Sequence, residues 1–250
     1  MLEINSIHLG ECLEIMEQIE DKSIDMVLCD LPYEVTSKCE WDVIIPFDKL
    51  WEQYERIIKT NGAIVLTGTQ PFTSKLIMSN LKLFKYCWVY EKTSATNYLN
   101  AKKQPMKYHE DVFAKQQTLY NPQMILGEPY SRKHSKGNPD ECAYNKDTRV
   151  SGQITTNVSG ERYPSTIIRF KNQSGRGLHP TQKPVELFEY LIKTYTNEGD
   201  LVLDNCAGSF TTAIAALNTN RKYICIEKEE KYFNIGQTRI NECSKTTNKK

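Results

Sequence analysis

Apolar residues in the first third of the chain recur in two different rhythms. Ser23–Asp30 is a short apolar run that ends in an acid, which is typical of a buried parallel strand. Phe47–Lys59 has apolar residues at helical spacing, and the Asn61-Gly62 pair behind it is typical of a helix C-cap. The same rhythms predict a helix at 71–81 and strands at 63–67 and 84–90.

The last third of the chain repeats this alternation. Amphipathic helices are predicted at 184–194, 211–217 and 229–243, and strands at 200–203 and 222–226. Strand–helix alternation at both ends indicates one doubly wound α/β sheet that is assembled from both termini.

The middle of the chain, roughly 94–177, breaks the pattern. It is rich in Asn, Lys, Gln, Tyr, Pro and Gly, and only 107–115 and 165–170 look like strands. A compact domain rarely contains so long a stretch without regular structure, so we expect an inserted recognition element. The predicted division is an α/β domain of residues 1–93 and 178–243, an insertion at 94–177 and a frayed tail at 244–250.

Composition narrows the class of protein. The chain has 250 residues, 39% of them apolar and 25% charged, and no apolar run approaches the ~20 residues of a membrane span. Its N-terminal segment has no basic region, so we expect no secretory signal, no membrane partner and a cytoplasmic location. The eight cysteines are scattered without a CxxC pair, which favours free thiols over a disulfide scaffold or a metal site.

Charge is distributed unevenly along the chain. The formal net charge is only +1 at pH 7, yet Lys92–Lys183 holds 15 Lys and Arg against 7 Asp and Glu. A basic middle between acidic flanks predicts contact with a polyanion such as nucleic acid. On charge alone, a solvated Lys-rich loop region remains the alternative.

Asp30-Leu31-Pro32-Tyr33 directly follows the first predicted buried strand. In open α/β sheets, ligands bind beyond the carboxyl ends of the strands. Pro32 stiffens the turn, which can aim the Asp30 carboxylate and the Leu31 carbonyl at one point, where they suit a target with two N–H donors such as an NH2 group. Tyr33 offers a ring that can stack on a flat base. Taken alone, four such residues more often form a plain strand-ending turn.

Leu201–Thr212 combines a predicted strand, a glycine-containing turn and the start of a helix. Such a turn lets a ligand approach the backbone and the helix N-terminus. Glu227 ends the next predicted strand about twenty residues later, where a carboxylate can accept hydrogen bonds from a ribose diol. The pair predicts a cofactor that carries adenosine. The chain has neither a GxGxxG nor a Walker-type phosphate loop, so a dinucleotide or a triphosphate is disfavoured, and a plain strand-to-helix turn is the alternative.

Four strings together resemble the motifs of the DNA amino-methyltransferases: DLPY at 30–33, HPTQKPVEL at 179–187, LDNCAGSFTT at 203–212 and ICIEKEEKYF at 224–233. Their order resembles the permuted β class, and phage-type adenine-N6 enzymes most closely, over roughly residues 1–115 and 165–240. The resemblance implies a circularly permuted, Rossmann-like methyltransferase sheet with a target-recognition insertion. It also implies S-adenosylmethionine as cofactor and double-stranded DNA as partner, and leaves a homodimer open.

The resemblance implies roles for the acceptor turn and the basic middle. Asp30 and the Leu31 carbonyl, held by Pro32, would bind the target amino group, and Tyr33 would pack on the flipped base. His109-Glu110 matches a pair found in related sequences, although a histidine on a strand is more often structural than catalytic. The candidate DNA contacts are Lys102, Lys103, Lys107, Arg132, Lys133, Arg149 and Arg176.

For the cofactor, the resemblance implies that Thr181 and Lys183 cover the methionine end and that Glu227 binds the ribose. The other implied cofactor-binding residues are Glu11, Cys12, Asp30, Asp204, Cys206, Ala207, Gly208, Ser209 and Thr211.

Two positions depart from the family's pattern. Glu34 stands where the family usually has a small residue, and Phe210 replaces the second glycine of the cofactor loop. Phenylalanine carries a steric cost where φ is positive or the cofactor comes close, whereas a Phe210 that faces the core would be harmless, and we expect the latter.

The sequence thus predicts direct methyl transfer to adenine N6 after base flipping. Three alternatives stay open. The first is cytosine N4, although the family's cytosine enzymes more often carry Ser where Asp30 stands. The second is a non-catalytic DNA-binding relative in which Phe210 has closed the cofactor pocket. The third is methylation of RNA or protein.

Overall fold

A computed structural model of the chain describes residues 2–34, 41–115, 119–133, 154–172 and 181–247. The chain divides into two compact units, Met1–Asn121 with Thr166–Lys250, and Pro122–Ser165. Arg149 and Arg176, two of the predicted DNA contacts, lie outside the described residues. In the described part of the chain, no helix combines the length and the apolar character needed to cross a bilayer.

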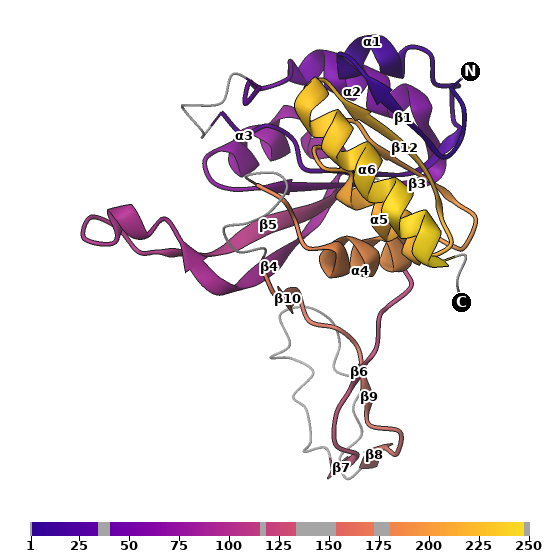
Figure 1. The fold of residues 1–250 in the computed structure, drawn as a ribbon. Helices are drawn as coiled ribbons and strands as arrows, with labels where there is room; N and C mark the ends of the chain where they lie inside the picture. Colours follow the sequence, from indigo (N-terminus) through magenta and orange to yellow (C-terminus); the bar gives the residue numbers. More distant parts are fainter. Residues whose placement is uncertain (1, 35–40, 116–118, 134–153, 173–180, 248–250) are drawn as a thin grey trace. The chain divides into compact units, whose positions relative to one another are not determined.

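A mixed sheet forms the centre of the first unit (Figure 1). Among the described residues it has eight strands in the order β1–β12–β11–β2–β3–β5–β4–β10. The first five run parallel, β5 is antiparallel to both β3 and β4, and β10 pairs parallel with β4. The strands are β1 (Ser6–Leu9), β2 (Ile24–Cys29), β3 (Ile58–Gly68), β4 (Phe84–Thr96), β5 (Lys107–Lys115), β10 (Ile167–Phe170), β11 (Leu201–Asp204) and β12 (Lys222–Glu227).

The late strands β11 and β12 lie between the early strands β1 and β2, so the sheet is assembled from both ends of the chain, as the alternating pattern predicts. Its helices are α1 (Cys12–Met16), α2 (Phe47–Ile57), α3 (Phe72–Ser79), α4 (Val185–Tyr195), α5 (Thr211–Asn218) and α6 (Glu230–Thr247), with short 3-10 turns η1 (Leu81–Leu83) and η2 (Tyr98–Asn100).

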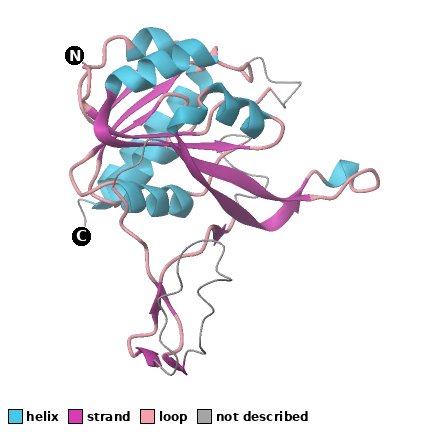
Figure 2. Cartoon of the chain, turned by 180° about the vertical axis from the view of Figure 1, so that it is seen from behind, coloured by secondary structure: helices cyan, strands magenta, loops and turns pink. Residues whose placement is uncertain are grey.

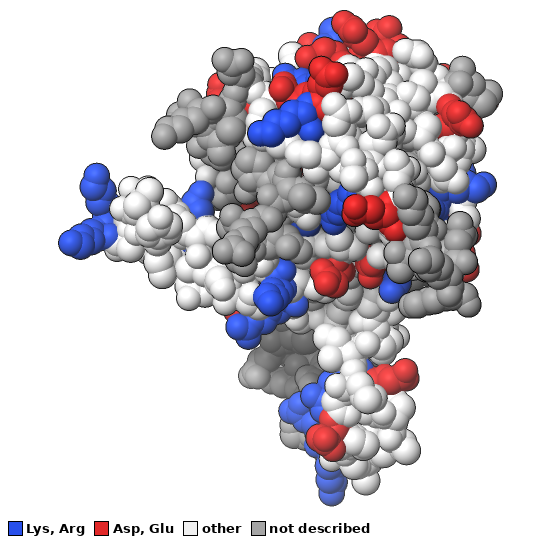
Figure 3. Space-filling view, viewed as in Figure 1, with Lys and Arg blue, Asp and Glu red and all other residues white. Residues whose placement is uncertain are grey.

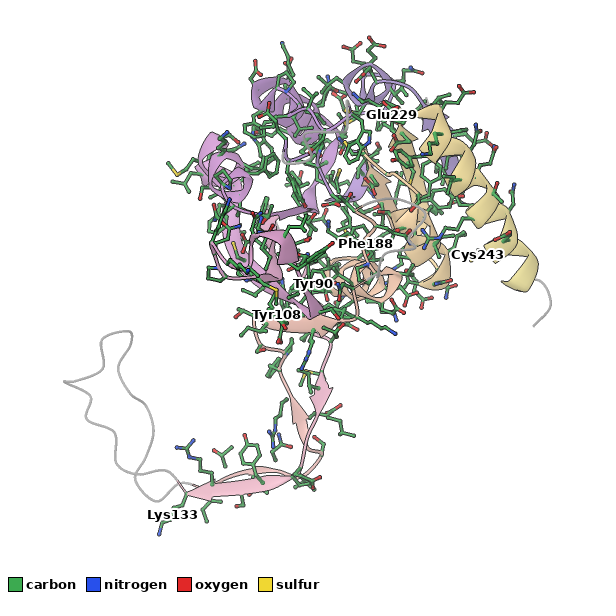
Figure 4. The ribbon with its side chains drawn as sticks, turned by 60° about the vertical axis from the view of Figure 1, so that its left-hand side comes forward. Tyr90, Tyr108, Lys133, Phe188, Glu229 and Cys243 are labelled. Atoms are coloured by element: carbon green, nitrogen blue, oxygen red, sulfur yellow. The ribbon has the colours of Figure 1, made fainter. Side chains whose placement is uncertain are left out.

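Helices cover both faces of the sheet (Figure 2) because successive strand residues point to opposite sides. Val27 and Cys29 of β2 pack with residues of α1, α2 and α3. Met26 and Leu28 of the same strand pack with residues of α4, α5 and α6. Phe188 of α4 belongs to this second cluster and lies inside the body of the unit (Figure 4). A strand that is apolar on both faces therefore sits in the middle of the core.

Two predicted boundaries are wrong. Asn61-Gly62 does not cap α2, because β3 begins immediately at Ile58, which pairs with Ile24 of β2. Pairing along the central strand thus overrides a local capping signal. At the other end, α6 continues to Thr247, four residues into the segment predicted to be a frayed tail.

The segment 94–177, predicted to be one insertion, is divided between the main sheet and the second unit. Strands β5 and β10 belong to the main sheet, and Val112 and Ala114 of β5 are fully buried in its core. The β4–β5 hairpin extends from the body and carries η2 at its tip (Figures 1 and 2). The second unit, Pro122–Ser165, contains two small antiparallel pairs among its described residues: β6 (Ile125–Leu126) with β9 (Glu161–Arg162), and β7 (Tyr130–Lys133) with β8 (Ile154–Asn157).

Candidate active site

A pocket opens at the carboxyl ends of β2, β11 and β12. The pocket is lined by all the predicted cofactor-binding residues and by the whole predicted acceptor turn: Glu11, Cys12, Asp30, Leu31, Pro32, Tyr33, Thr181, Lys183, Asp204, Cys206, Ala207, Gly208, Ser209, Thr211 and Glu227. Segments far apart in the sequence meet here because the parallel strands end at the same edge of the sheet.

The loop between β11 and α5 is built around Asp204. Its Oδ1 accepts the backbone N–H of Cys206 at 3.1 Å, and its Oδ2 accepts the Thr212 hydroxyl. Burial raises the pKa of Asp204 to about 7, although both of these hydrogen bonds favour the ionised form. Tyr54 of α2 reaches the same loop from behind and donates to Asn205 Oδ1 at 2.5 Å.

Glu227 links the loop after β11 to the turn after β12. Its Oε2 accepts the Gly208 N–H at 2.7 Å, and its Oε1 accepts the Glu229 N–H at 2.8 Å. Burial raises the pKa of Glu227. Since each carboxylate oxygen has two lone pairs, both oxygens keep acceptor capacity for a ligand in the pocket.

Phe210 takes the place of a glycine in this loop and keeps a glycine-like backbone, with φ 57° and ψ 42°. A left-handed conformation costs a non-glycine residue about 1–2 kcal/mol. The ring is fully buried, contacts Phe233 edge-on at 5.8 Å and is absent from the pocket lining. A Cβ added at Gly236 of α6 would lie only 2.0 Å from Phe210 Cδ2, so that glycine makes room for the ring. Phe210 therefore faces the core, as expected, and leaves the pocket open.

Arg239 of α6 holds the outer side of the same loop. Its guanidinium donates to the Ser209 carbonyl at 2.9 Å and to the Thr211 hydroxyl at 3.1 Å. The loop is thus fixed from α2, α6 and β12 before any ligand binds, which lowers the entropic cost of binding.

The acceptor turn after β2 is also held rigidly. Both Tyr33 and Thr67 donate their hydroxyls to Asp30 Oδ1. Asp42 Oδ1 accepts the backbone N–H groups of Tyr33 at 2.8 Å and of Glu34 at 2.9 Å. Glu34 is exposed and has a φ of 59°, which lies in the left-handed region of the backbone.

The second oxygen of Asp30 is engaged by Lys183, whose Nζ lies 2.5 Å from Oδ2. The same ammonium lies 3.2 Å from Glu110 Oε2, and Lys92 Nζ lies 2.5 Å from Glu110 Oε1. Burial alone would lower the pKa of Lys183, but Asp30 and Glu110 raise it well above its ordinary value. Burial alone would raise the pKa of Glu110, but the two lysines lower it. These four charges form a continuous chain of two buried lysines and two half-buried carboxylates that ends at Asp30.

Sequence reasoning missed several residues of the pocket and its supports. Thr67 carries a detectable signal, because it lies near the end of the predicted strand next to β2. Lys92 carries none, since its contact with Glu110 depends on the pairing of β4 with β5. His109, beside Glu110, is exposed and does not line the pocket. The other missed lining residues are Trp41, Asp42, Val43, Ile45, Phe188, Asn205 and Lys228.

The described candidates for DNA contact lie outside this pocket. Lys102, Lys103 and Lys107 are exposed on the β4–β5 hairpin, and basic side chains gather at its tip (Figure 3). Arg132 and Lys133 are exposed on β7 of the second unit, where Figure 4 marks Lys133. In the same unit, Arg162 lies over the ring of Tyr130, 5.6 Å from its centroid.

Comparison with known protein families finds a match to the DNA methylase model of N6 and N4 methyltransferases over residues 24–238. The type II methyltransferase M2.MboI of Moraxella bovis is 28% identical over 266 residues, which cover 95% of this chain and 88% of that protein. The DNA adenine methyltransferase YhdJ of Escherichia coli strain K12 is 27% identical over 264 residues, covering 97% of this chain and 84% of that protein.

Solved structures share the fold. The M1.HpyAVI–SAM complex superposes with a TM-score of 0.62 at 21% identity, and covers 94% of this chain and 98% of its own. The cytosine-N4-specific PvuII DNA methyltransferase superposes with a TM-score of 0.67 at 16% identity, and covers 96% of this chain and 87% of its own. Likeness at this level of identity shows the fold alone.

Proposed function

We propose that this chain, which belongs to the N6/N4 DNA methylase family, methylates the N6 amino group of adenine in duplex DNA. Members of this family are S-adenosylmethionine-dependent DNA methyltransferases. The proposal concerns the target base, which we infer to be adenine. The observation that carries methylation of an amino group is the pocket lined by both the acceptor turn and the cofactor loop, and the choice of adenine rests on the similarity to the DNA adenine methyltransferase YhdJ. A methyl donor and an amino group can only react if both are held at one place.

The residues of the pocket fit the cofactor. Glu227 ends β12 with acceptor capacity to spare for a ribose diol, and the loop from Asp204 to Thr211 offers its backbone to the rest of the molecule. Glu11 adds a further carboxylate to the lining, which suits a ligand with a sulfonium and an ammonium group. When bound, S-adenosylmethionine supplies an electrophilic methyl group on positively charged sulfur.

The acceptor turn suits the amino group. An exocyclic base nitrogen is a weak nucleophile because its lone pair is delocalised into the ring. Asp30 and the Leu31 carbonyl can accept hydrogen bonds from its two N–H groups. These two hydrogen bonds favour a tetrahedral nitrogen whose lone pair points out of the ring plane. Tyr33 offers the ring on which a flipped base stacks. The hydrogen bond from its hydroxyl to Asp30 fixes the ring and the carboxylate relative to each other. Catalysis then rests on positioning and electrostatics, with no covalent enzyme intermediate.

The basic side chains outside the pocket suit the DNA backbone. Lys102 and Lys103 lie at the tip of the β4–β5 hairpin beside Leu99, which is 82% exposed. Lysines contact phosphates without reading sequence, and they would position the duplex. In the second unit, the pair of Arg162 and Tyr130 combines a cation with a flat ring, a combination common in nucleic-acid recognition.

The test is transfer of labelled methyl from S-adenosylmethionine to unmethylated duplex DNA, followed by analysis of the nucleosides. We expect N6-methyladenine. N4-methylcytosine instead would identify the rival target, because the matched family covers N4 as well as N6 methyltransferases.

Two other outcomes would overturn the reaction itself. Preferred transfer to RNA in a competition with duplex DNA would show that RNA, and not DNA, is the substrate. DNA binding without transfer and without a thermal shift from the cofactor would identify a non-catalytic relative.

A further inference from the structure

The chain of buried charges at Asp30 is more than the fold requires. Lys92 on β4 and Lys183 before α4 are only 8% and 7% exposed, and they alternate with Glu110 and Asp30. Removing each ion from water costs several kcal/mol, and ion pairs in protein interiors often do no better than apolar residues of the same size. A network of this kind beside a reacting centre therefore calls for a functional explanation.

The acceptor oxygens of Asp30 are almost fully occupied. Oδ1 already takes the hydroxyls of Tyr33 and Thr67, which use both of its lone pairs. Oδ2 takes the Lys183 ammonium at 2.5 Å. A target amino group that is to bind Asp30 must therefore share or take over the oxygen that Lys183 holds.

Lys183 lies where an amino donor for Asp30 would lie. Its Nζ is within hydrogen-bond distance of Oδ2 and 5.6 Å from the centroid of the Tyr33 ring. An ammonium group on an aromatic face makes a cation–π contact that a stacked base would displace. Lys183 Nζ thus occupies both contacts that the proposed target base needs, the hydrogen bond to Asp30 and the face of the Tyr33 ring.

Glu110 offers the ammonium a second place. Its Oε2 is buried and lies 3.2 Å from Lys183 Nζ, in an ion pair that lacks hydrogen-bond geometry. Turning the ammonium from Asp30 to Glu110 would add that hydrogen bond, while Lys92 keeps the Glu110 side chain in place through Oε1.

We propose that Lys183 holds the amino-group position at Asp30 when DNA is absent, and hands that position to the target base by moving to Glu110. Lys183 and Glu110 are then positioning residues that keep Oδ2 of a half-buried carboxylate paired and release it only to a matching donor. This rests on the proposed function, since it needs a target with an exocyclic amino group. It does not depend on whether that base is adenine or cytosine.

The opposing explanation is a static clamp, in which Lys183 simply fixes the orientation of Asp30. The two differ in the effect of removing the ammonium. With the exchange, Lys183→Met frees Oδ2 and strengthens binding of the amino group. With the clamp, the same change loosens Asp30 and weakens it.

The experiment compares two duplexes that carry the methylation site found in the transfer assay. One has the natural target base, and the other has that base with its amino group replaced by hydrogen. Dissociation constants are measured with S-adenosylhomocysteine present, at about pH 8, far above the ordinary pKa of a carboxylic acid. The readout is the ratio of the two constants, which isolates the amino group from all other DNA contacts.

We expect Lys183→Met to increase this ratio about tenfold, the size of one hydrogen bond to a charged group. Glu110→Gln should decrease it, because the ammonium then stays on Asp30. Lys59→Met is the matched control, since it breaks a 2.7 Å ion pair with Asp25 at the opposite end of β2 and should leave the ratio unchanged.

A ratio that falls in Lys183→Met would overturn the exchange and establish the clamp. If that variant does not fold, as judged by its melting curve, Lys183→Gln provides the same comparison with a polar neutral side chain. Failure of the proposed function looks different, because the unmodified enzyme would then show no methyl transfer and no preference for the amino-bearing duplex.

Discussion

The pocket and the β4–β5 hairpin of the same unit are built on opposite principles. In the pocket, the central side chains are buried or half-buried and held by several partners, as Asp30 is by Tyr33, Thr67 and Lys183. On the hairpin, Tyr98 and Leu99 are 73% and 82% exposed, and the lysines near them are exposed as well.

The difference follows from what each region has to bind. A small ligand that reacts needs groups fixed in advance to within fractions of an ångström, which only a packed and fully bonded interior provides. A long polyanion is attracted by charge over a distance, and exposed lysines serve this purpose without a fixed geometry. Single substitutions should therefore have large, specific effects in the pocket and small, additive effects on the hairpin.

The largest effect is expected from Asp30→Ala. The change removes the carboxylate that is proposed to bind the target amino group, and should lower methyl transfer by about a thousandfold or more. Cofactor binding, followed by the thermal shift with S-adenosylmethionine, should be largely retained. Asp21→Ala is the control, because that carboxylate is exposed and pairs with Arg56 away from the pocket. Near-normal turnover of Asp30→Ala would remove the proposed role.

The next effect concerns the packing behind the cofactor loop. Gly236→Ala places a Cβ 2.0 Å from Phe210 Cδ2, so we expect a loss of about 1–3 kcal/mol of stability despite the better helix propensity of alanine. For a chain of this size that corresponds to a melting temperature lower by about 2–4 °C per kcal/mol.

In a Phe210→Gly background, Gly236→Ala should cost much less stability than it does in the unmodified chain, because the ring that the new methyl group would meet is absent. Gln237→Ala, exposed on the same helix, is the control for helix propensity. An unchanged melting temperature for Gly236→Ala would mean that the ring is free to move.

A smaller effect should appear in the pH dependence of stability. The pKa of Asp204 is raised from 3.8 to about 7 in the fold, so the folded state binds more protons than the unfolded state between these values. Stability from this group is therefore greatest below about pH 4 and falls as pH rises to about 7, by at most about 1.4 kcal/mol per pH unit. Urea unfolding at several pH values should show this slope, and Asp204→Asn should reduce it. An equal slope in the variant would contradict the assignment.

The smallest effects are expected on the hairpin. Lys102→Ala and Lys103→Ala should each weaken duplex binding severalfold and reduce the salt dependence by about one counterion. Methyl transfer at saturating DNA should be unaffected. Lys49→Ala, exposed on α2, serves as the control. A large loss of transfer at saturating DNA would mean that the hairpin takes part in positioning the base, and would break the contrast with the pocket.

The elements and the cofactor loop could be predicted because their signals are local. The apolar periodicity of 47–59 and 184–194 and the buried run at 23–30 correspond to α2, α4 and β2, and the order of the four motifs identified the family. The prediction at Asn61-Gly62 failed because strand pairing with β2 outweighed the local turn signal. The limits of the inserted region were not readable either, since whether a strand such as β5 joins the main sheet depends on partners distant in sequence.

By itself, the sequence determined the candidates for the chemistry: an acid and a carbonyl on a stiff turn, a glycine-containing loop, and an acid at the end of the following strand. Only the tertiary structure decided what surrounds them. It turned Phe210 into the core against Gly236, and it joined Lys92, Glu110, Lys183 and Asp30 into one chain of charges. The physical reason is that a contact between side chains depends on distance in space, and no spacing along the chain encodes the space that a distant glycine leaves or the partner that a buried lysine finds.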